Sequence, residues 1–182
     1  MTASAVSQVR LLLMDVDGVL TKGEIIYGPG PLELKVFHVR DGMGITLARA
    51  AGLRVGILTG RTSEAVTRRC RELAVDIIVQ NSPDKKAGYE AIKRKYNYSD
   101  KEIAYIGDDI QDIPVLRQVG VPLGVRNSVP EVKQLCTYVA AQDGGDGAVR
   151  EIIEWILEKQ NRKQEAIAEA IRQMQNAVTV RT

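Results

Sequence analysis

The stretch LLLMDVDGVLT, from Leu11 to Thr21, decides the fold class of this chain. An apolar run leads straight into Asp15 and Asp17, and Gly18 then begins a turn. Alternate residues of a strand share one side, but where the strand ends in a loop both carboxyl groups can point into one pocket. Two carboxylates and the free backbone N–H groups of a turn suit a hard cation and a phosphoryl group. Taken alone, the stretch also fits a plain strand and a polar turn, because Asp-Gly is a common turn signal.

Composition narrows the function classes. The 182 residues suit one domain with a sizeable core, and a net charge of +2 gives no basic field that would attract nucleic acid. No apolar stretch reaches membrane-spanning length and the N-terminus lacks a signal-peptide core, so we expect a cytoplasmic protein with no membrane or nucleic-acid partner. Cys70 and Cys136 form no metal-binding pattern. His38 is the single histidine, so acid–base chemistry is expected to fall to carboxylates.

Short β-type runs alternate with helical runs along most of the chain. The candidate strands are residues 10–14, 54–58, 76–79, 103–106, 122–125 and 138–140, and the candidate helices are 44–51, 64–73, 85–95, 110–119 and 131–136. This alternation predicts an α/β fold, a Rossmann-like parallel sheet with helices on both faces. In such sheets, ligands bind beyond the carboxyl ends of the strands.

Two segments depart from the alternation. Residues 23–37 read as a β-hairpin around the turn sequence GPGP, and we expect this flap either to cover the double-aspartate pocket or to bind a neighbouring subunit. Residues 148–177 show the apolar spacing of one or two long helices. The expected organisation is one domain over residues 1–159, which includes the hairpin, followed by a helical tail over residues 160–182. We expect this tail to be exposed, frayed or packed on another subunit.

A polar cluster follows each of the first four strands of the predicted parallel sheet, which places all four clusters at one edge. The clusters contain Asp15 and Asp17, then Thr59-Gly60-Arg61, then Lys85, then the acidic run from Asp108 to Asp112. Carboxylates from two strands can hold Mg²⁺, and a hydroxyl and an ammonium can bind the remaining phosphoryl oxygens. Each cluster alone also fits a turn, a helix cap or a solvated helix residue. Their joint order favours phosphoryl transfer.

These residues resemble the phosphohydrolases of the haloacid dehalogenase-like (HAD) superfamily, whose pattern is DxDG, Thr or Ser, Lys and GDDxxD at successive strands. The resemblance implies a nucleophile that becomes an aspartyl-phosphate at Asp15 and a general acid/base at Asp17. It implies phosphoryl contacts by Thr59 and Lys85. It also implies that Mg²⁺ is held by Asp15, the backbone carbonyl of Asp17 and Asp108, with support from Asp109 and Asp112.

Within that superfamily, residues 10–157 look like the family of 3-deoxy-D-manno-octulosonate 8-phosphate (KDO 8-phosphate) phosphatases. The resemblance implies an Mg²⁺-dependent hydrolase without a cap domain, a homotetramer joined through its hairpins, and a role in lipopolysaccharide precursor synthesis. The implied contacts to the phosphorylated sugar acid are His38, Val39, Arg40, Asp41, Gly42, Thr46, Gly60, Arg61, Arg69 and Lys85. Two positions differ from the family's usual pattern: Lys22 replaces an acidic residue, and Asp146 replaces a frequent arginine.

Other functions remain open at this level. A sister group with the same core hydrolyses nonulosonate (sialic-acid-type) 9-phosphates, and Arg61 favours the octulosonate because that position tends to be acidic in the sister group. Another small sugar phosphate is a further alternative. A phosphotransferase generally needs a cap to exclude water, and no cap-length insertion follows Thr59. A catalytically inactive HAD scaffold would be free to lose Asp15, Asp17, Lys85 and Asp108, which this chain retains.

Overall fold

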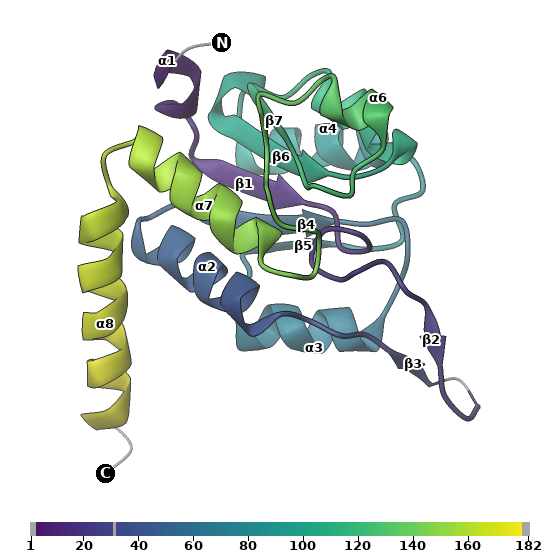
Figure 1. Ribbon diagram of the computed structural model, residues 1–182, viewed down its shortest axis with the longest axis horizontal. Coiled ribbons are helices and arrows are strands. Elements are labelled where there is room, and N and C mark those ends of the chain that lie inside the picture. The colour runs from purple at the N-terminus through teal and green to yellow at the C-terminus, as the bar shows by residue number, and fades with distance from the viewer. Residues whose placement is uncertain (1–2, 31, 180–182) are drawn as a thin grey trace.

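A parallel six-stranded sheet forms the centre of the molecule (Figure 1), for which a computed structural model describes residues 3–30 and 32–179. The strand order is β5-β4-β1-β6-β7-β8, with every neighbouring pair parallel. The strands are β1 (Leu11–Met14), β4 (Arg54–Leu58), β5 (Ile77–Val79), β6 (Ile103–Gly107), β7 (Val121–Gly124) and β8 (Tyr138–Val139). The predicted parallel sheet is therefore confirmed.

Helices cover both faces of the sheet. They are α1 (Ala3–Val6), α2 (Val39–Ala50), α3 (Glu64–Glu72), α4 (Lys85–Tyr96), α5 (Ile113–Leu116), α6 (Pro130–Lys133), α7 (Ala148–Lys159) and α8 (Lys163–Thr179), with 3₁₀ turns η1 (Asp100–Glu102) and η2 (Ile110–Asp112). The strand β1 divides the core between the two faces, because alternate side chains point to opposite sides. Leu12 and Met14 pack in the cluster formed with α2, α3 and α7, whereas Leu11 and Leu13 pack in the cluster formed with α4, α5 and α6.

Strand register brings the polar clusters together. Met14 pairs with Ile57 of β4 and with Ile106 of β6, so the residues that follow these three strands leave the sheet side by side. The backbone N–H of Asp15 donates to the carbonyl of Ile106 over 2.9 Å, which continues the ladder by one residue. The carboxyl ends of β1, β4 and β6 thus meet at one edge, as the sequence predicts.

The predicted hairpin is present, and the residues that the structure describes form no cap domain in its place. Strands β2 (Ile26–Tyr27) and β3 (Glu33–Leu34) pair antiparallel and project from the body on the side opposite α8 (Figure 1). The chain between β1 and β4 forms this hairpin and α2, and the chain between β4 and β5 forms α3. The edge of the sheet is therefore covered by a small flap and not by a second domain.

Several predicted helix bounds are wrong. The helix predicted over 44–51 begins at Val39, because Gly44 is not a helix breaker here: it lets α2 approach α7, and a Cβ at Gly44 would lie 2.9 Å from the Cα of Arg150. The helix predicted over 110–119 splits into η2 and α5, and the helix predicted over 131–136 ends at Lys133. A capping box between Asp109 and Asp112 holds η2 as a separate turn.

The C-terminal segment forms two helices, and the second packs on the same chain. Helix α8 lies along α2, with Ala166 and Ala170 buried in the core cluster. The guanidinium of Arg162 donates to the backbone carbonyl of Ala51, which fixes the start of α8. The start of the tail thus packs on its own chain, whereas Ile171 and Met174 of α8 are exposed. The domain boundary at residue 159 stays a prediction. In the described parts of the chain, no helix combines the length and apolarity needed to cross a membrane.

Candidate active site

A buried ion-paired lysine lies at the centre of the site. The Nζ atom of Lys85, the first residue of α4, lies 2.7 Å from Oδ2 of Asp15 and 2.6 Å from Oδ1 of Asp112. All three side chains are buried, with 1% or less of each exposed. Burial by itself lowers the pKa of Lys85, but the adjacent Asp15 and Asp112 carboxylates outweigh it and leave that pKa above its ordinary value. An ammonium has three protons, so Lys85 keeps one donor for an incoming oxygen.

Asp112 is fully engaged by donors. Its Oδ1 also accepts from the Tyr105 hydroxyl at 2.6 Å, and its Oδ2 accepts from the backbone N–H groups of Asp108 and Asp109 at 3.0 and 3.3 Å. Asp112 therefore orients Lys85 and shapes the turn that carries Asp108. Tyr105 lies in the middle of β6 and reads in the sequence as an ordinary core residue, so sequence reasoning missed its part in the site.

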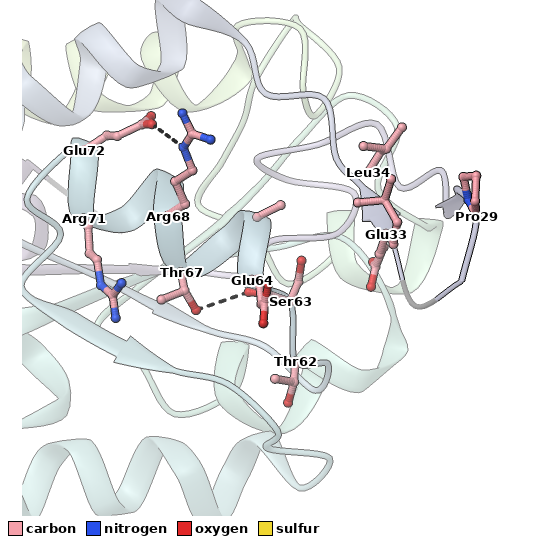
Figure 2. Close-up of a pocket in the computed structure, with 12 residues that line it drawn as sticks. Pro29, Glu33, Leu34, Thr62, Ser63, Glu64, Thr67, Arg68, Arg71 and Glu72 are labelled. Atoms are coloured by element: carbon pink, nitrogen blue, oxygen red, sulfur yellow. Dashed lines mark hydrogen bonds and ion pairs between the residues drawn. The ribbon is translucent and has the colours of Figure 1, made fainter.

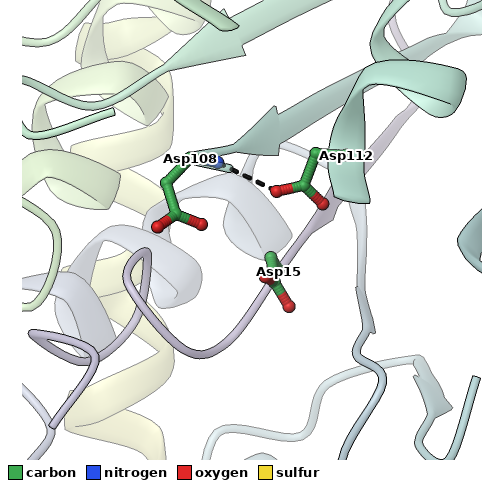
Figure 3. Close-up of side chains that lie close together, drawn as sticks. All are labelled: Asp15, Asp108 and Asp112. Carbon is green, nitrogen blue, oxygen red and sulfur yellow. Dashed lines mark hydrogen bonds between the residues drawn. The ribbon is translucent and has the colours of Figure 1, made fainter. Parts of the chain in front are cut away.

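Asp15 and Asp108 each have a carboxylate oxygen without a hydrogen-bond partner among the described residues. Together with Asp112 they bring three carboxylate oxygens within 4.8 Å of one another, and Figure 3 shows the three side chains converging from β1, the end of β6 and η2. Oδ1 of Asp15 and Oδ1 of Asp108 are buried and receive no well-formed hydrogen bond from the residues that the structure describes. Buried polar atoms are normally satisfied, so these two oxygens point to a missing ligand.

Charge balance identifies the kind of ligand. Burial raises the pKa of Asp15 to about 6, with Asp112 adding to the effect and Lys85 opposing it. Burial likewise raises the pKa of Asp108 to about 7, with Asp112 and Asp15 adding to it. Three carboxylates face one ammonium, so a hard divalent cation between Asp15 and Asp108 would offset the surplus negative charge. The residues present therefore fit Mg²⁺.

Gly18 lets the Asp108 carboxylate approach the turn after β1. Gly18 has φ +90°, and a Cβ there would lie 2.0 Å from Oδ2 of Asp108. We expect Gly18→Ala to displace Asp108 and to reduce turnover by about 10²-fold, the order of loss that follows a misplacement of about 1 Å. Steady-state phosphate release at saturating Mg²⁺ measures the effect.

Gly30 provides the matched control for this substitution. It also has positive φ, at +64°, but a Cβ there would meet nothing within 4 Å. Gly30→Ala is therefore expected to carry the backbone strain of about 1–2 kcal/mol while keeping turnover within about twofold. Equal losses of turnover in the two variants would show that strain, and not Asp108, is the cause.

Asp17 faces the hairpin. Its Oδ1 accepts from the Lys35 ammonium and, at 3.5 Å, from the Thr21 hydroxyl, while its Oδ2 lies 3.8 Å from Nε of Arg61. Glu33 completes the group, with its Oε1 3.0 Å from Lys35 Nζ and 3.4 Å from Arg61 Nη2. The sequence left open whether the hairpin covers this pocket or binds a neighbouring subunit, and it did not single out Lys35 or Glu33. Their i, i+2 spacing in a β arm was the available signal, since it puts both on one side.

The Thr59-Gly60-Arg61 cluster follows β4, the neighbour of β1. Thr59 is buried, and its backbone N–H donates to the carbonyl of Val79 at the end of β5. A Cβ added at Gly60 would have the carbonyl oxygen of Ser82 as its nearest neighbour, at 3.7 Å. The register therefore brings the Thr59 hydroxyl, the first predicted phosphoryl donor, to the same edge as Asp15.

The predicted sugar contacts divide into two groups. His38, Asp41, Gly42 and Arg69 line one small cavity of about 10 Å³, and Arg69 packs against the backbone of Gly42. Val39 and Arg40 are exposed at the start of α2, and the Thr46 hydroxyl donates to the carbonyl of Gly42 at 3.2 Å. A cavity of that size holds no more than a water, and sugar contact by these four residues stays a prediction.

Asp41 has a structural role that the sequence did not reveal. Its carboxylate oxygens accept from the backbone N–H groups of Gly147 and Arg150 at 3.3 and 2.9 Å, which caps the start of α7. Burial raises the pKa of Asp41, and these backbone hydrogen bonds oppose the shift. Because Asp41 is buried and both oxygens are engaged, the arrangement favours a role in joining α2 to α7 over direct contact with a substrate.

A glycine-rich loop supports the turn that carries the acidic residues. The N–H of Gly145 donates to the carbonyl of Val19 at 2.9 Å, and a Cβ at Gly144 would lie 1.7 Å from the carbonyl oxygen of Gly18. Asp146, in the same loop, has Oδ1 3.8 Å from Nε2 of His38. Close backbone contact between two loops explains why glycines are needed at 144 and 145.

A wide cleft adjoins the hairpin (Figure 2). It has a volume of about 1220 Å³ and lies between the hairpin and α3. Its lining comprises Pro29, Leu32, Glu33, Leu34, Thr62, Ser63, Glu64, Ala65, Thr67, Arg68, Arg71 and Glu72. Glu33 borders this cleft and also pairs with Lys35 and Arg61, so the cleft and the surroundings of Asp17 adjoin at that residue.

Comparisons with known proteins agree with this geometry. A family model for haloacid dehalogenase-like hydrolases matches residues 73–153. The 3-deoxy-D-manno-octulosonate 8-phosphate phosphatase KdsC of Escherichia coli (strain K12) is 37% identical over 163 residues, covering 90% of this chain and 87% of that protein. The crystal structure of such a phosphatase from Moraxella catarrhalis, in complex with magnesium ion, phosphate ion and KDO, matches with a TM-score of 0.88 and 36% identity, covering 91% of this chain and 95% of that one.

A phosphatase of the same name from Yersinia pestis matches with a TM-score of 0.86 and 36% identity, covering 89% of this chain and 88% of that one. The likeness therefore extends over about nine-tenths of this chain and is not confined to a single motif. Because sequence identity above one third runs through nearly the whole of both chains, this protein belongs to the haloacid dehalogenase-like hydrolases and, within them, to the family of 3-deoxy-D-manno-octulosonate 8-phosphate phosphatases.

Proposed function

We propose that this protein hydrolyses KDO 8-phosphate to KDO and inorganic phosphate, with Mg²⁺, in the synthesis of lipopolysaccharide precursor. The observation that carries the proposal is the convergence of Asp15, Lys85 and Asp108 at one buried edge, with two carboxylate oxygens unsatisfied. Phosphoryl transfer depends mainly on positioning and on charge stabilisation, and this set supplies both without a histidine.

The first half-reaction forms an aspartyl-phosphate. An oxygen of Asp15 attacks phosphorus, and the bond from phosphorus to the sugar oxygen breaks with its electron pair passing to that oxygen. Asp17 donates the proton that makes the leaving group a neutral alcohol. The remaining donor of Lys85 and the Thr59 hydroxyl bind the phosphoryl oxygens and oppose the charge that builds in the transition state.

The second half-reaction returns the enzyme to its starting state. The Asp17 carboxylate takes a proton from water, and the resulting hydroxide attacks phosphorus. The bond from phosphorus to Asp15 breaks, which releases inorganic phosphate and restores the carboxylate. Bound Mg²⁺ would supply charge neutralisation at the phosphoryl oxygens, held by Asp15, the backbone carbonyl of Asp17 and Asp108.

Mg²⁺ affinity is expected to depend on pH, because a cation competes with protons for its carboxylate ligands. The pKa of Asp108 is raised to about 7 and that of Asp15 to about 6, so both are ionised at about pH 8 and protonate as the pH falls. Affinity should fall by about tenfold per pH unit for each competing proton below these values. Isothermal titration calorimetry at about pH 8, 7 and 6 measures this. An affinity that stays constant over the range would contradict the assignment of these ligands.

A second substrate class deserves comparison because of the residue at position 146. Asp146 replaces a frequent arginine and lies 3.8 Å from His38, which puts a negative charge beside one of the predicted sugar contacts. A carboxylate at that place would repel the carboxylate of an octulosonate. A nonulosonate 9-phosphate carries the same two charged groups on a longer chain, so it is the competing candidate.

Phosphate release from a panel of esters tests the proposal. The panel comprises KDO 8-phosphate, nonulosonate 9-phosphates and ordinary hexose phosphates, each with Mg²⁺ and with EDTA. We expect the highest kcat/KM for KDO 8-phosphate and no turnover in EDTA. A preference for a nonulosonate ester would move the substrate to the sister group, and turnover of none of them by folded, Mg²⁺-loaded protein would support the inactive scaffold.

The functional unit is proposed to be a homo-oligomer, and specifically a tetramer joined through the hairpins. The hairpin exposes a run of large apolar side chains: Ile25, Ile26, Tyr27, Leu32, Leu34 and Val36. Contiguous apolar surface of this kind is uncommon on monomers. Light scattering after size-exclusion chromatography measures the assembly, and a monomer at micromolar concentration would contradict it.

A further inference from the structure

Lys35 directly follows β3, and its side chain is shielded from solvent while most of the hairpin is exposed. The side chain of Lys35 is 1% exposed although the residue as a whole is half-buried, whereas the neighbouring residues Leu34 and Val36 are 48% and 67% exposed. A lysine is almost never buried unless its charge is paired, since a lone buried ammonium is strongly disfavoured. Lys35 is the only lysine or arginine among residues 23–37. Its side chain is therefore turned toward the pocket, whereas the apolar side chains of the hairpin face outward.

The partners of Lys35 connect the hairpin to the acidic turn. The ammonium bonds to Oδ1 of Asp17 and lies 3.0 Å from Oε1 of Glu33. Its hydrogen bond is the main reason that the pKa of Glu33 lies below its ordinary value. Arg61 also approaches the same two carboxylates, at 3.8 Å from Asp17 and 3.4 Å from Glu33. Two cations and two anions therefore alternate across three chain segments.

The two oxygens of Asp17 have different surroundings. Oδ1 is held by Lys35, while the nearest cation atom to Oδ2 is Nε of Arg61 at 3.8 Å, beyond hydrogen-bond distance. A general acid must hold its proton-carrying oxygen within hydrogen-bond reach of the leaving oxygen, and an anchored Oδ1 beside an Oδ2 without a hydrogen bond from either cation suits that role. The pairing with Lys35 thus anchors Oδ1 and leaves Oδ2 available for the proton.

We propose that Lys35 is a positioning residue: it fixes Asp17 through Oδ1 and leaves Oδ2 to pass the proton to the leaving oxygen. This inference rests on the proposed phosphatase function, in which the bond to the ester oxygen breaks as that oxygen receives the proton of Asp17. Through Glu33 and Lys35, the placement of the acid depends on where the hairpin lies. The hairpin is thus part of the proton-transfer apparatus as well as a flap.

Leaving-group dependence tests the proposal. p-Nitrophenol is acidic enough to leave without a proton, whereas a sugar alcohol is not. We expect Lys35→Met to lower kcat for KDO 8-phosphate by about 10²–10³-fold, the usual contribution of a placed general acid. The same variant should lower kcat for p-nitrophenyl phosphate by less than about threefold, with KM changed little for either ester. Lys35→Arg, which keeps a buried cation, should restore most of the lost kcat.

Two control variants separate this role from simple anchoring of the hairpin. Glu33→Gln keeps the contact between Lys35 and Asp17 but loosens the hairpin end of the network, so it should lose far less activity than Lys35→Met. Lys86→Met removes an exposed lysine of α4 and should leave both activities unchanged. Equal losses of kcat on the two esters in Lys35→Met, or a loss in Glu33→Gln as large, would overturn the positioning role while the wild-type activity still stands. Inactive wild-type protein on both esters would overturn the phosphatase function, and this inference with it.

Discussion

Asp15→Asn abolishes turnover and leaves the fold intact. The amide has nearly the shape of the carboxylate, and its oxygen can still accept from Lys85, but it cannot form the acyl-phosphate. We expect kcat for KDO 8-phosphate to fall by about 10⁴–10⁶-fold, as for other nucleophiles that act within a catalytic unit. The folded protein should be no less stable above about pH 6, because the variant no longer has to ionise a buried acid whose pKa is raised to about 6.

Phosphate release and thermal unfolding of the same preparation measure both effects. Asp76→Asn is the matched control: the Asp76 carboxylate accepts from the backbone N–H of Val55 at 2.9 Å, at the amino end of the strands and away from the site. That variant should keep full activity. An Asp15→Asn protein that retains turnover within tenfold of wild type would show that another residue is the nucleophile.

Lys85→Met has the largest expected effect on stability. The substitution leaves the buried carboxylates of Asp15 and Asp112 without their shared cation, at 2.7 and 2.6 Å in the wild type. Removing one partner of a buried ion pair commonly costs about 3–5 kcal/mol of unfolding free energy. Denaturant unfolding at about pH 8 measures the loss, and activity should vanish with it. Lys86→Met, at the neighbouring exposed position, should change stability by less than about 0.5 kcal/mol.

The destabilisation of Lys85→Met should shrink as the pH falls. Lys85 lowers the pKa of Asp15, so its removal raises that pKa above about 6 and further from the ordinary value of the unfolded chain. A carboxyl whose pKa is raised by folding contributes stability at low pH that is lost as the pH rises through the folded value. The variant is therefore relatively more stable at about pH 5 than at about pH 8. The double variant Lys85→Met, Asp15→Asn should recover part of the loss and flatten the pH dependence; an unchanged pH profile would contradict the assignment to Asp15.

The pattern of apolar runs and strand-end clusters determined the fold class and most of the site. Runs such as 54–58 carry their own signal, because a buried parallel strand must be apolar and its end must turn. Since parallel strands end at one edge, the order of Asp15, Thr59, Lys85 and Asp108 along the chain sufficed to predict that they meet. Helix ends were less predictable: the start of α2 at Val39 depends on the close packing of Gly44 against α7, a contact between distant segments.

Only the tertiary structure decided which groups complete the site. Lys35 lies 18 residues from Asp17 along the chain, and the sequence gives no measure of whether a hairpin lysine turns toward the pocket or toward water. Tyr105 reads as a core residue until its hydroxyl is seen to donate to Asp112. Asp41 is a predicted sugar contact, and only the fold shows that its oxygens also cap α7. Local patterns report the periodicity of the backbone, whereas the partner of a buried charge depends on long-range packing, and that is why these three residues required the fold.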